Sequence, residues 1–168
     1  MAIPVSVAEF DVAPVADAAA ELLACCASKR WIAAVVAARP YRDLATLTAT
    51  SDRTITGLAW PDVEEALAAH PRIGERVAGN GREATWSREE QAGTRLADVE
   101  TDAALRAGNL AYEQHFGHVF LICATGRTAS EMLDALRTRL TNPVEVERDV
   151  VRAELAKIVR LRLTKAFA

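Results

Sequence analysis

Three features of the sequence combine residue types that can move a proton or bind a small polar molecule. The first is His70 in the stretch "HPRIGE", residues 70–75. Pro71 cannot continue a helix, so His70 is the last residue that the preceding helix can include. A histidine at a helix C-terminus often caps free carbonyl groups there. The same imidazole suits a catalytic base or a ligand, and this stretch alone leaves both interpretations open.

The second feature is "SREEQ", residues 87–91. Ser87, Glu90 and Gln91 are spaced i, i+3 and i+4, so they share one helical face, while Glu89 is turned away from it. Ser87 followed by Glu90 also matches a capping box at a helix start. The pattern therefore predicts either a solvated helix start or the polar wall of a site.

The third feature is an arginine on an apolar stripe. Val151, Leu155 and Ile158 follow helical spacing, and one further turn reaches Arg162. A guanidinium that faces the core is costly to bury unless it meets an anion or another acceptor. A structural salt bridge would satisfy Arg162, and so would a carboxylate or carbonyl of a substrate.

A metal site is not predicted. His115 and His118 are three residues apart, but Gly117 lies between them and no third ligand has suitable spacing. The dinucleotide, phosphate-loop, serine-elbow, flavin and pyridoxal signatures are also missing from the sequence. The residues therefore favour proton transfer on a small polar substrate without a metal or an organic cofactor.

The composition favours helices packed closely together. Among 168 residues, 51% are apolar, many of them alanine, and only 5% are aromatic. Helical spacing and breakers predict helices over 14–27, 28–38, 42–57 ending at Gly57, 62–69 capped by Asp62, 87–116 in two pieces, 128–140, and 143–167. We expect a mobile surface loop over 77–85, and a buried turn or an extended connector at "HVFLICA", 118–124. The predicted fold is all-α, a single compact domain over 1–168 with about seven to nine helices.

Charge and cysteines restrict the compartment and the partners. A formal charge of −3 with scattered basic residues gives no footprint for nucleic acid, and no segment has the apolar length of a membrane span. Cys25 and Cys26 are adjacent, which disfavours a disulfide between them and suits small core residues in a reducing compartment. Without a signal-peptide pattern at the start, the sequence predicts a cytoplasmic protein.

Several stretches together resemble a known family. "CCASKRW…RPY", "HPRIGE", "S..EQ.G" at 87–93, "N..Y…FG.VF.ICA.G" at 109–126, "RL.N" at 139–142 and "LRL" at 161–163 occur in order across most of the chain. On these motifs the chain resembles the OHCU decarboxylases, which convert 2-oxo-4-hydroxy-4-carboxy-5-ureidoimidazoline to (S)-allantoin at the end of urate breakdown to allantoin. His115 and His118 depart from the usual residues of the family at their positions.

The resemblance implies an all-α enzyme without metal or cofactor, acting on a small molecule and often dimeric. It implies catalysis by His70 and Glu90. Substrate binding falls to the matching positions, namely Pro71, Ser87, Gln91, Phe116, Ile122 and Arg162. The family role adds to the reasons for an inward-facing Arg162.

Two other interpretations remain. A helical binding or regulatory module would have exposed amphipathic stripes and no enclosed polar pocket. A metal-dependent hydrolase built on His70, His115, His118 and Glu75 would lose its activity to a chelator.

Overall fold

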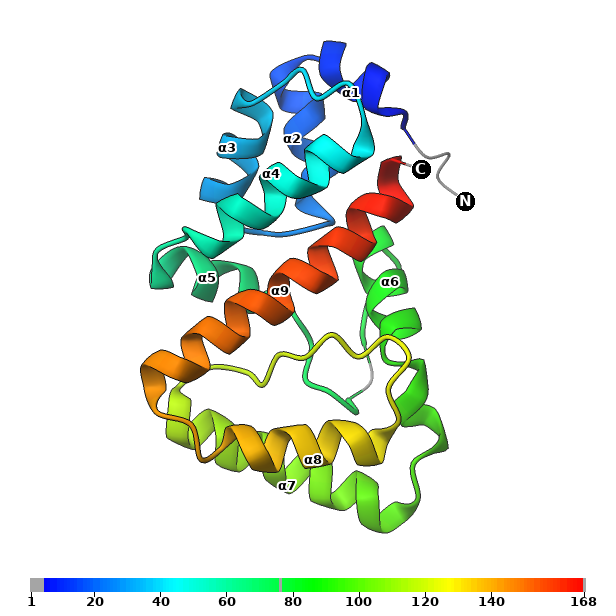
Figure 1. Ribbon diagram of the computed structural model, residues 1–168. Coiled ribbons are helices and arrows are strands. Elements are labelled where there is room, and N and C mark those ends of the chain that lie inside the picture. The colour runs from blue at the N-terminus through cyan, green and yellow to red at the C-terminus, as the bar shows by residue number, and fades with distance from the viewer. Residues whose placement is uncertain (1–4, 76, 168) are drawn as a thin grey trace. The chain divides into compact units, whose positions relative to one another are not determined.

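In the computed structural model, the described residues are 5–75 and 77–167, and they contain helices and no strand. The all-α prediction is confirmed. The helices are α1 (Val7–Val12), α2 (Val15–Leu23), α3 (Lys29–Ala37), α4 (Leu44–Thr56), α5 (Trp60–Leu67), α6 (Arg82–Glu90), a 3-10 helix η1 (Ala92–Leu96), α7 (Val99–Phe116), α8 (Ala129–Arg139) and α9 (Val144–Phe167) (Figure 1). Within the described residues, no helix combines the length and the apolar character needed to span a membrane.

The chain forms two compact units. One comprises residues up to Ala66 together with Leu155 onward, and the other comprises Leu67–Glu154. The boundary near the C-terminus falls inside α9. Whether the two units make up a single domain, as the sequence predicts, stays a prediction.

In the first unit, α3 packs against both α2 and α4. Ser28 caps α3 by accepting from the Trp31 amide, and the Trp31 indole donates to the Ser51 hydroxyl at 3.1 Å. Cys25 and Cys26 are buried, as expected of small core residues. Burial raises the pKa of the Cys26 thiol to about 11, so this thiol is protonated at neutral pH.

In the second unit, α7 and α8 lie side by side (Figure 1). Their buried faces and the connector between them form one apolar cluster, which includes Ile73, Leu105, Tyr112, Phe120, Ile122, Ala124, Ala129, Met132, Leu133 and Leu136. Gly108 of α7 allows a close approach, since a Cβ there would lie 2.8 Å from a methyl of Leu136.

The connector 117–128 has no regular secondary structure, yet Phe120, Leu121 and Ile122 are buried. Buried backbone groups need partners, and two side chains supply them. Arg139 donates to the Leu121 carbonyl at 2.7 Å, and the Cys123 amide donates to Glu154 at 2.7 Å. The extended-connector alternative is the one that the structure shows.

Arg139 is itself held by a buried carboxylate. Glu147 pairs with Arg139 at 2.6 Å and also accepts from Tyr112 and Asn142. Burial and the bond to Glu147 raise the pKa of the Tyr112 hydroxyl. The "RL.N" motif therefore has a structural role, because both Arg139 and Asn142 bind Glu147 of the last helix.

Several predicted boundaries are wrong. The first predicted helix ends at Leu23 rather than at 27, and α1 was not anticipated because six residues carry too little periodicity. Helix α5 begins at Trp60, so Asp62 lies in its first turn and is not its cap. Pro61 is tolerated there because first-turn amides have no partner within the helix.

The largest correction concerns the segment before "SREEQ". Helix α6 begins at Arg82 with Gly81 as its N-cap, so the predicted loop over 77–85 ends at Gly81. Ser87 lies near the end of this helix and cannot form a capping box at its start. The capping-box interpretation of Ser87 and Glu90 is therefore wrong, and Ser87 is buried rather than solvated.

Candidate active site

His70 lies just beyond α5, where the chain turns into the "HPRIGE" segment. Its amide donates to the Leu67 carbonyl at 2.9 Å, which closes the last turn before Pro71. A hollow of about 310 Å³ is lined by Ala68, Ala69, His70, Pro71, Val77, Ala78, Glu83, Ala84 and Ser87. Three predicted site residues, His70, Pro71 and Ser87, thus share one cavity wall although Ser87 is 17 positions from His70.

Helix α6 positions Ser87, which is only 2% exposed. Glu83 and Ala84, one turn earlier, line the same hollow. A small hydroxyl in a partly apolar cavity can orient one polar group of a ligand.

The two glutamates at the end of α6 differ in environment. Glu90 is half-buried and Glu89 is exposed. Glu90 does not line the hollow of His70, Pro71 and Ser87. The difference in burial agrees with the prediction that Glu90 shares the helical face of Ser87 and Gln91 while Glu89 is turned away from it. The catalytic role of Glu90 stays a prediction.

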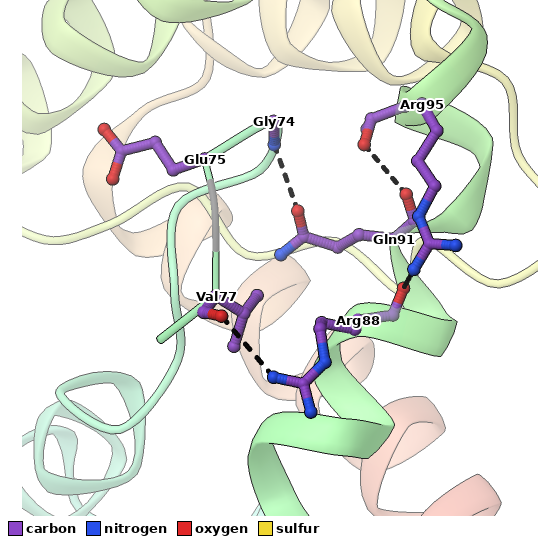
Figure 2. Close-up of a pocket in the computed structure, with 7 residues that line it drawn as sticks. Gly74, Glu75, Val77, Arg88, Gln91 and Arg95 are labelled. Carbon is purple, nitrogen blue, oxygen red and sulfur yellow. Dashed lines mark hydrogen bonds between the residues drawn. The ribbon is translucent and has the colours of Figure 1, made fainter. Parts of the chain in front are cut away.

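Gln91 follows α6 and contacts the "HPRIGE" segment directly. Its Oε1 accepts from the Gly74 amide at 3.0 Å, as Figure 2 shows. It lines a second hollow of about 350 Å³ with Gly74, Glu75, Val77, Arg88, Thr94 and Arg95. Val77 borders both hollows, so Ser87 and Gln91 face cavities that adjoin at one residue.

Three consecutive residues of "HPRIGE" are held by side chains. Besides the Gly74–Gln91 bond, the Ile73 carbonyl accepts from Asn109 at 2.9 Å. Arg72 binds both carboxylate oxygens of Glu113, at 2.5 and 2.8 Å. The bond to Arg72 lowers the pKa of Glu113, so this carboxylate is ionised at neutral pH. The segment that follows His70 therefore has a fixed path.

Gly74 has φ +85°, a backbone conformation that side chains other than glycine adopt only with strain. This explains the glycine of "HPRIG", because the turn after Ile73 requires the left-handed region.

The other predicted site residues lie elsewhere. Phe116 and Ile122 belong to the apolar cluster of the second unit or pack against it, and neither is a lining residue of the two hollows. Arg162 belongs to the first unit, where it is 1% exposed and donates to the Ala24 carbonyl at 3.3 Å. Its inward orientation is confirmed. That it binds the same ligand as His70 stays a prediction.

The two remaining histidines lie around the end of α7. His115 is exposed, and His118 is half-buried with Nδ1 3.0 Å from the Val119 carbonyl. Gly117 between them ends the helix at φ +80°. Over the described residues, no group of three His, Cys, Asp or Glu side chains is arranged to hold a metal ion.

Comparison with known proteins identifies the family. The family model described as OHCU decarboxylase matches residues 11–164. The chain belongs to the OHCU decarboxylase family. A 2-oxo-4-hydroxy-4-carboxy-5-ureidoimidazoline decarboxylase of Amia calva is 34% identical over 133 residues, which cover 78% of this chain and 76% of that protein.

A longer relative is the uric acid degradation bifunctional protein TTL of Arabidopsis thaliana. It is 33% identical over 148 residues, which are 86% of this chain but only 45% of that protein. The matched region thus spans less than half of the length of this bifunctional protein.

Solved structures agree with the family assignment. A crystal structure of OHCU decarboxylase in the presence of (S)-allantoin has a TM-score of 0.75 and 30% identity, covering 88% of this chain and 96% of that chain. A crystal structure of (S)-allantoin synthase has a TM-score of 0.72 and 19% identity, covering 97% of this chain and 54% of that chain. At this identity, the match shows a similar fold and nothing more.

Sequence reasoning missed the residues that hold "HPRIGE". Asn109 stood within the quoted motif "N..Y" without a role, and Glu113 follows it by four positions on the same face of α7. Their spacing was visible in the sequence, but their partners 36 and 41 residues away were not.

Proposed function

We propose that this protein decarboxylates 2-oxo-4-hydroxy-4-carboxy-5-ureidoimidazoline to (S)-allantoin, the last step of urate degradation to allantoin. The observation that carries the proposal is the match of the OHCU decarboxylase family over residues 11–164. The hollow shared by His70, Pro71 and Ser87 supports it, because it brings an imidazole and a hydroxyl from two successive segments to one small cavity.

The substrate itself supplies the electron sink. Its carboxylate is on a ring carbon that also bears a hydroxyl and adjoins a C=N bond. When the bond to the carboxylate breaks, carbon dioxide leaves and the electron pair moves into the imine. The imine nitrogen takes up a proton, which leaves an ene-diamine that still carries the hydroxyl. Protonation of one face of the former imine carbon then gives the (S) centre, while the hydroxyl loses its proton and becomes the ring carbonyl. We propose that this chemistry proceeds without a metal or an organic cofactor.

The protein has to orient the carboxylate and manage protons. In the proposal, neutral His70 takes or holds the hydroxyl proton, since imidazole titrates nearest to neutral pH. Glu90 either fixes the imidazole or bonds the hydroxyl. The remaining predicted groups bind the substrate, with Ser87 lining the hollow of His70 and Gln91 offering its amide beside Gly74.

Arg162, Phe116 and Ile122 complete the proposed site on the strength of the family resemblance. A buried guanidinium gives Arg162 two directed donors for the carbonyl or ureido group of the substrate. We further propose that the substrate is a small molecule, that the protein has no nucleic-acid or membrane partner, and that it is cytoplasmic. We also propose a homodimer, and light scattering would measure its mass.

The experiment compares wild type with His70→Asn on substrate generated in situ from urate. We expect wild type to accelerate carbon dioxide release over the spontaneous rate. His70→Asn should keep the fold and lower kcat about 100- to 10,000-fold, the usual contribution of a general acid or base. Turnover by His70→Asn close to that of wild type would leave helix capping as the role of His70.

A further inference from the structure

We propose that Glu113, through its two-pronged ion pair with Arg72, is a positioning residue for His70. The inference rests on the proposed function, because it assigns Glu113 a role in the reaction through the imidazole. Glu113 lines neither of the hollows around the "HPRIGE" segment, so it is not proposed to touch the substrate.

The covalent path from the ion pair to the imidazole is short. Only Pro71 separates Arg72 from His70, and its ring fixes φ near −65°, which removes one of the few soft torsions between them. On the other side of His70, the bond from its amide to the Leu67 carbonyl ties it to the end of α5. A displacement of Arg72 is therefore transmitted to His70.

The ion pair has the geometry of a clamp. The Arg72 Nε and Nη2 atoms meet the two carboxylate oxygens of Glu113 at 2.5 and 2.8 Å, the paired arrangement that fixes both distance and plane. Glu113 is on α7 one turn after Asn109, which holds the carbonyl of Ile73. Two side chains on one face of a long helix thus fix two consecutive residues of the segment.

Because the Arg72–Glu113 pair is partly exposed, its effect on the position of His70 can be distinguished from its effect on folding stability. The Arg72 side chain is 44% exposed and that of Glu113 is 20% exposed. Ion pairs as open to solvent as this one contribute little to folding stability. A catalytic group, in contrast, must be held to within a fraction of an ångström, and a misplacement of about 1 Å costs about 100-fold in rate. Loss of the clamp should therefore lower turnover much more than it lowers Tm.

The test is a double-mutant cycle on the full-length protein with Arg72→Ala, Glu113→Ala and the double variant. We expect each single variant to lose about tenfold or more in kcat, with KM within about twofold and Tm within about 3 °C of wild type. The double variant should lose no more than the worse single variant, because both changes remove one interaction. Arg72→Lys should also lose activity, since an ammonium keeps the charge but not the paired geometry.

Glu145→Gln is the matched control. It removes another ion pair of the second unit, in which the exposed Glu145 binds Arg148 at 3.1 Å, and neither residue lines the two hollows beside the "HPRIGE" segment. This variant should keep the kcat of wild type. Unchanged kcat in the Arg72 and Glu113 variants, or losses that add in the double variant, would overturn the proposal.

A second readout does not depend on activity. The chain has three histidines, so ¹⁵N-histidine spectra resolve the imidazole of each, and His70→Asn assigns its signal. We expect Glu113→Ala to shift or broaden the His70 signal and Glu145→Gln to leave it unchanged. A His70 signal identical to wild type in Glu113→Ala would overturn the positioning role. If wild type itself does not decarboxylate the substrate, the proposed function fails while this spectrum still tests the clamp.

Discussion

Glu89 and Glu90 are adjacent residues of α6 whose surroundings differ. Glu89 is exposed and Glu90 is half-buried. A catalytic Glu90 needs a carboxylate, because an amide cannot exchange a proton with an imidazole or substrate hydroxyl. A purely structural Glu90 would accept glutamine at little cost.

We therefore expect Glu90→Gln to lose at least about tenfold in kcat/KM, on the scale of lost acid–base help, while melting within a few degrees of wild type. Glu89→Gln is the control and should match wild type in both measurements. Equal kcat/KM in the two variants would remove Glu90 from the mechanism.

For single residues, the sequence allowed the polar or charged side chains of the site to be predicted, but not the partners that these side chains contact. The types and spacing of Ser87, Glu90 and Gln91 indicated a polar helical face, and an apolar stripe indicated an inward Arg162. The bond from the Gly74 amide to Gln91 was not foreseeable, because it depends on the path of a segment 17 residues earlier.

Helix α6, which carries Ser87, is followed directly by the 3-10 helix η1. Gly93 of η1 lies against the start of α8, and a Cβ built on it would come within 1.9 Å of the Arg127 carbonyl oxygen. This close approach of two backbones explains the glycine of the "S..EQ.G" motif. It also ties the end of the Ser87 helix to the segment before α8.

Gly93→Ala should therefore destabilise the protein. Overpacking of this kind costs about 1–3 kcal/mol. For a chain of this length, this corresponds to a fall of about 3–10 °C in Tm. The measurement is thermal unfolding followed by circular dichroism.

Gly57→Ala is the control, since φ at Gly57 is −90° and its added Cβ would have ordinary contacts of 3.6 Å or more. Its Tm should stay within about 3 °C of wild type. A Gly93→Ala variant as stable as Gly57→Ala would show that η1 and the segment before α8 are not packed this closely.

Most helices could be predicted from periodicity, caps and breakers, for example the one capped by Ser28 and the one capped by Thr128. The start of α6 could not, because "GNGREAT" has no apolar period and its glycines are typical of loops. An acidic residue, Glu83, and the Gly81 cap are the local signals for that start.

The reaction proposed for the whole protein requires no metal ion. The chain has no cluster of metal-ligating residues within its described part. We expect exhaustive chelation to leave kcat unchanged, with the buffer-treated protein as the control. Loss of activity on chelation and its recovery with zinc would favour the metal-dependent alternative built on the three histidines and Glu75.

For the whole protein, the amino-acid composition was enough to predict an all-α fold, but the division into two compact units could not be predicted. No linker-like composition marks residues 66–67 or 154–155, and the second of these boundaries falls within a continuous helix. The proposal that Arg162 and His70 bind one substrate rests on the family resemblance and not on local pattern.

We propose that the protein produces one enantiomer of allantoin by decarboxylation. The most direct measurement generates the substrate in situ from urate and follows the product by circular dichroism, with and without the protein. We expect rapid appearance of the (S)-allantoin signal, well ahead of the slow spontaneous reaction. A racemic product formed at the spontaneous rate, from folded wild-type protein, would contradict this proposal.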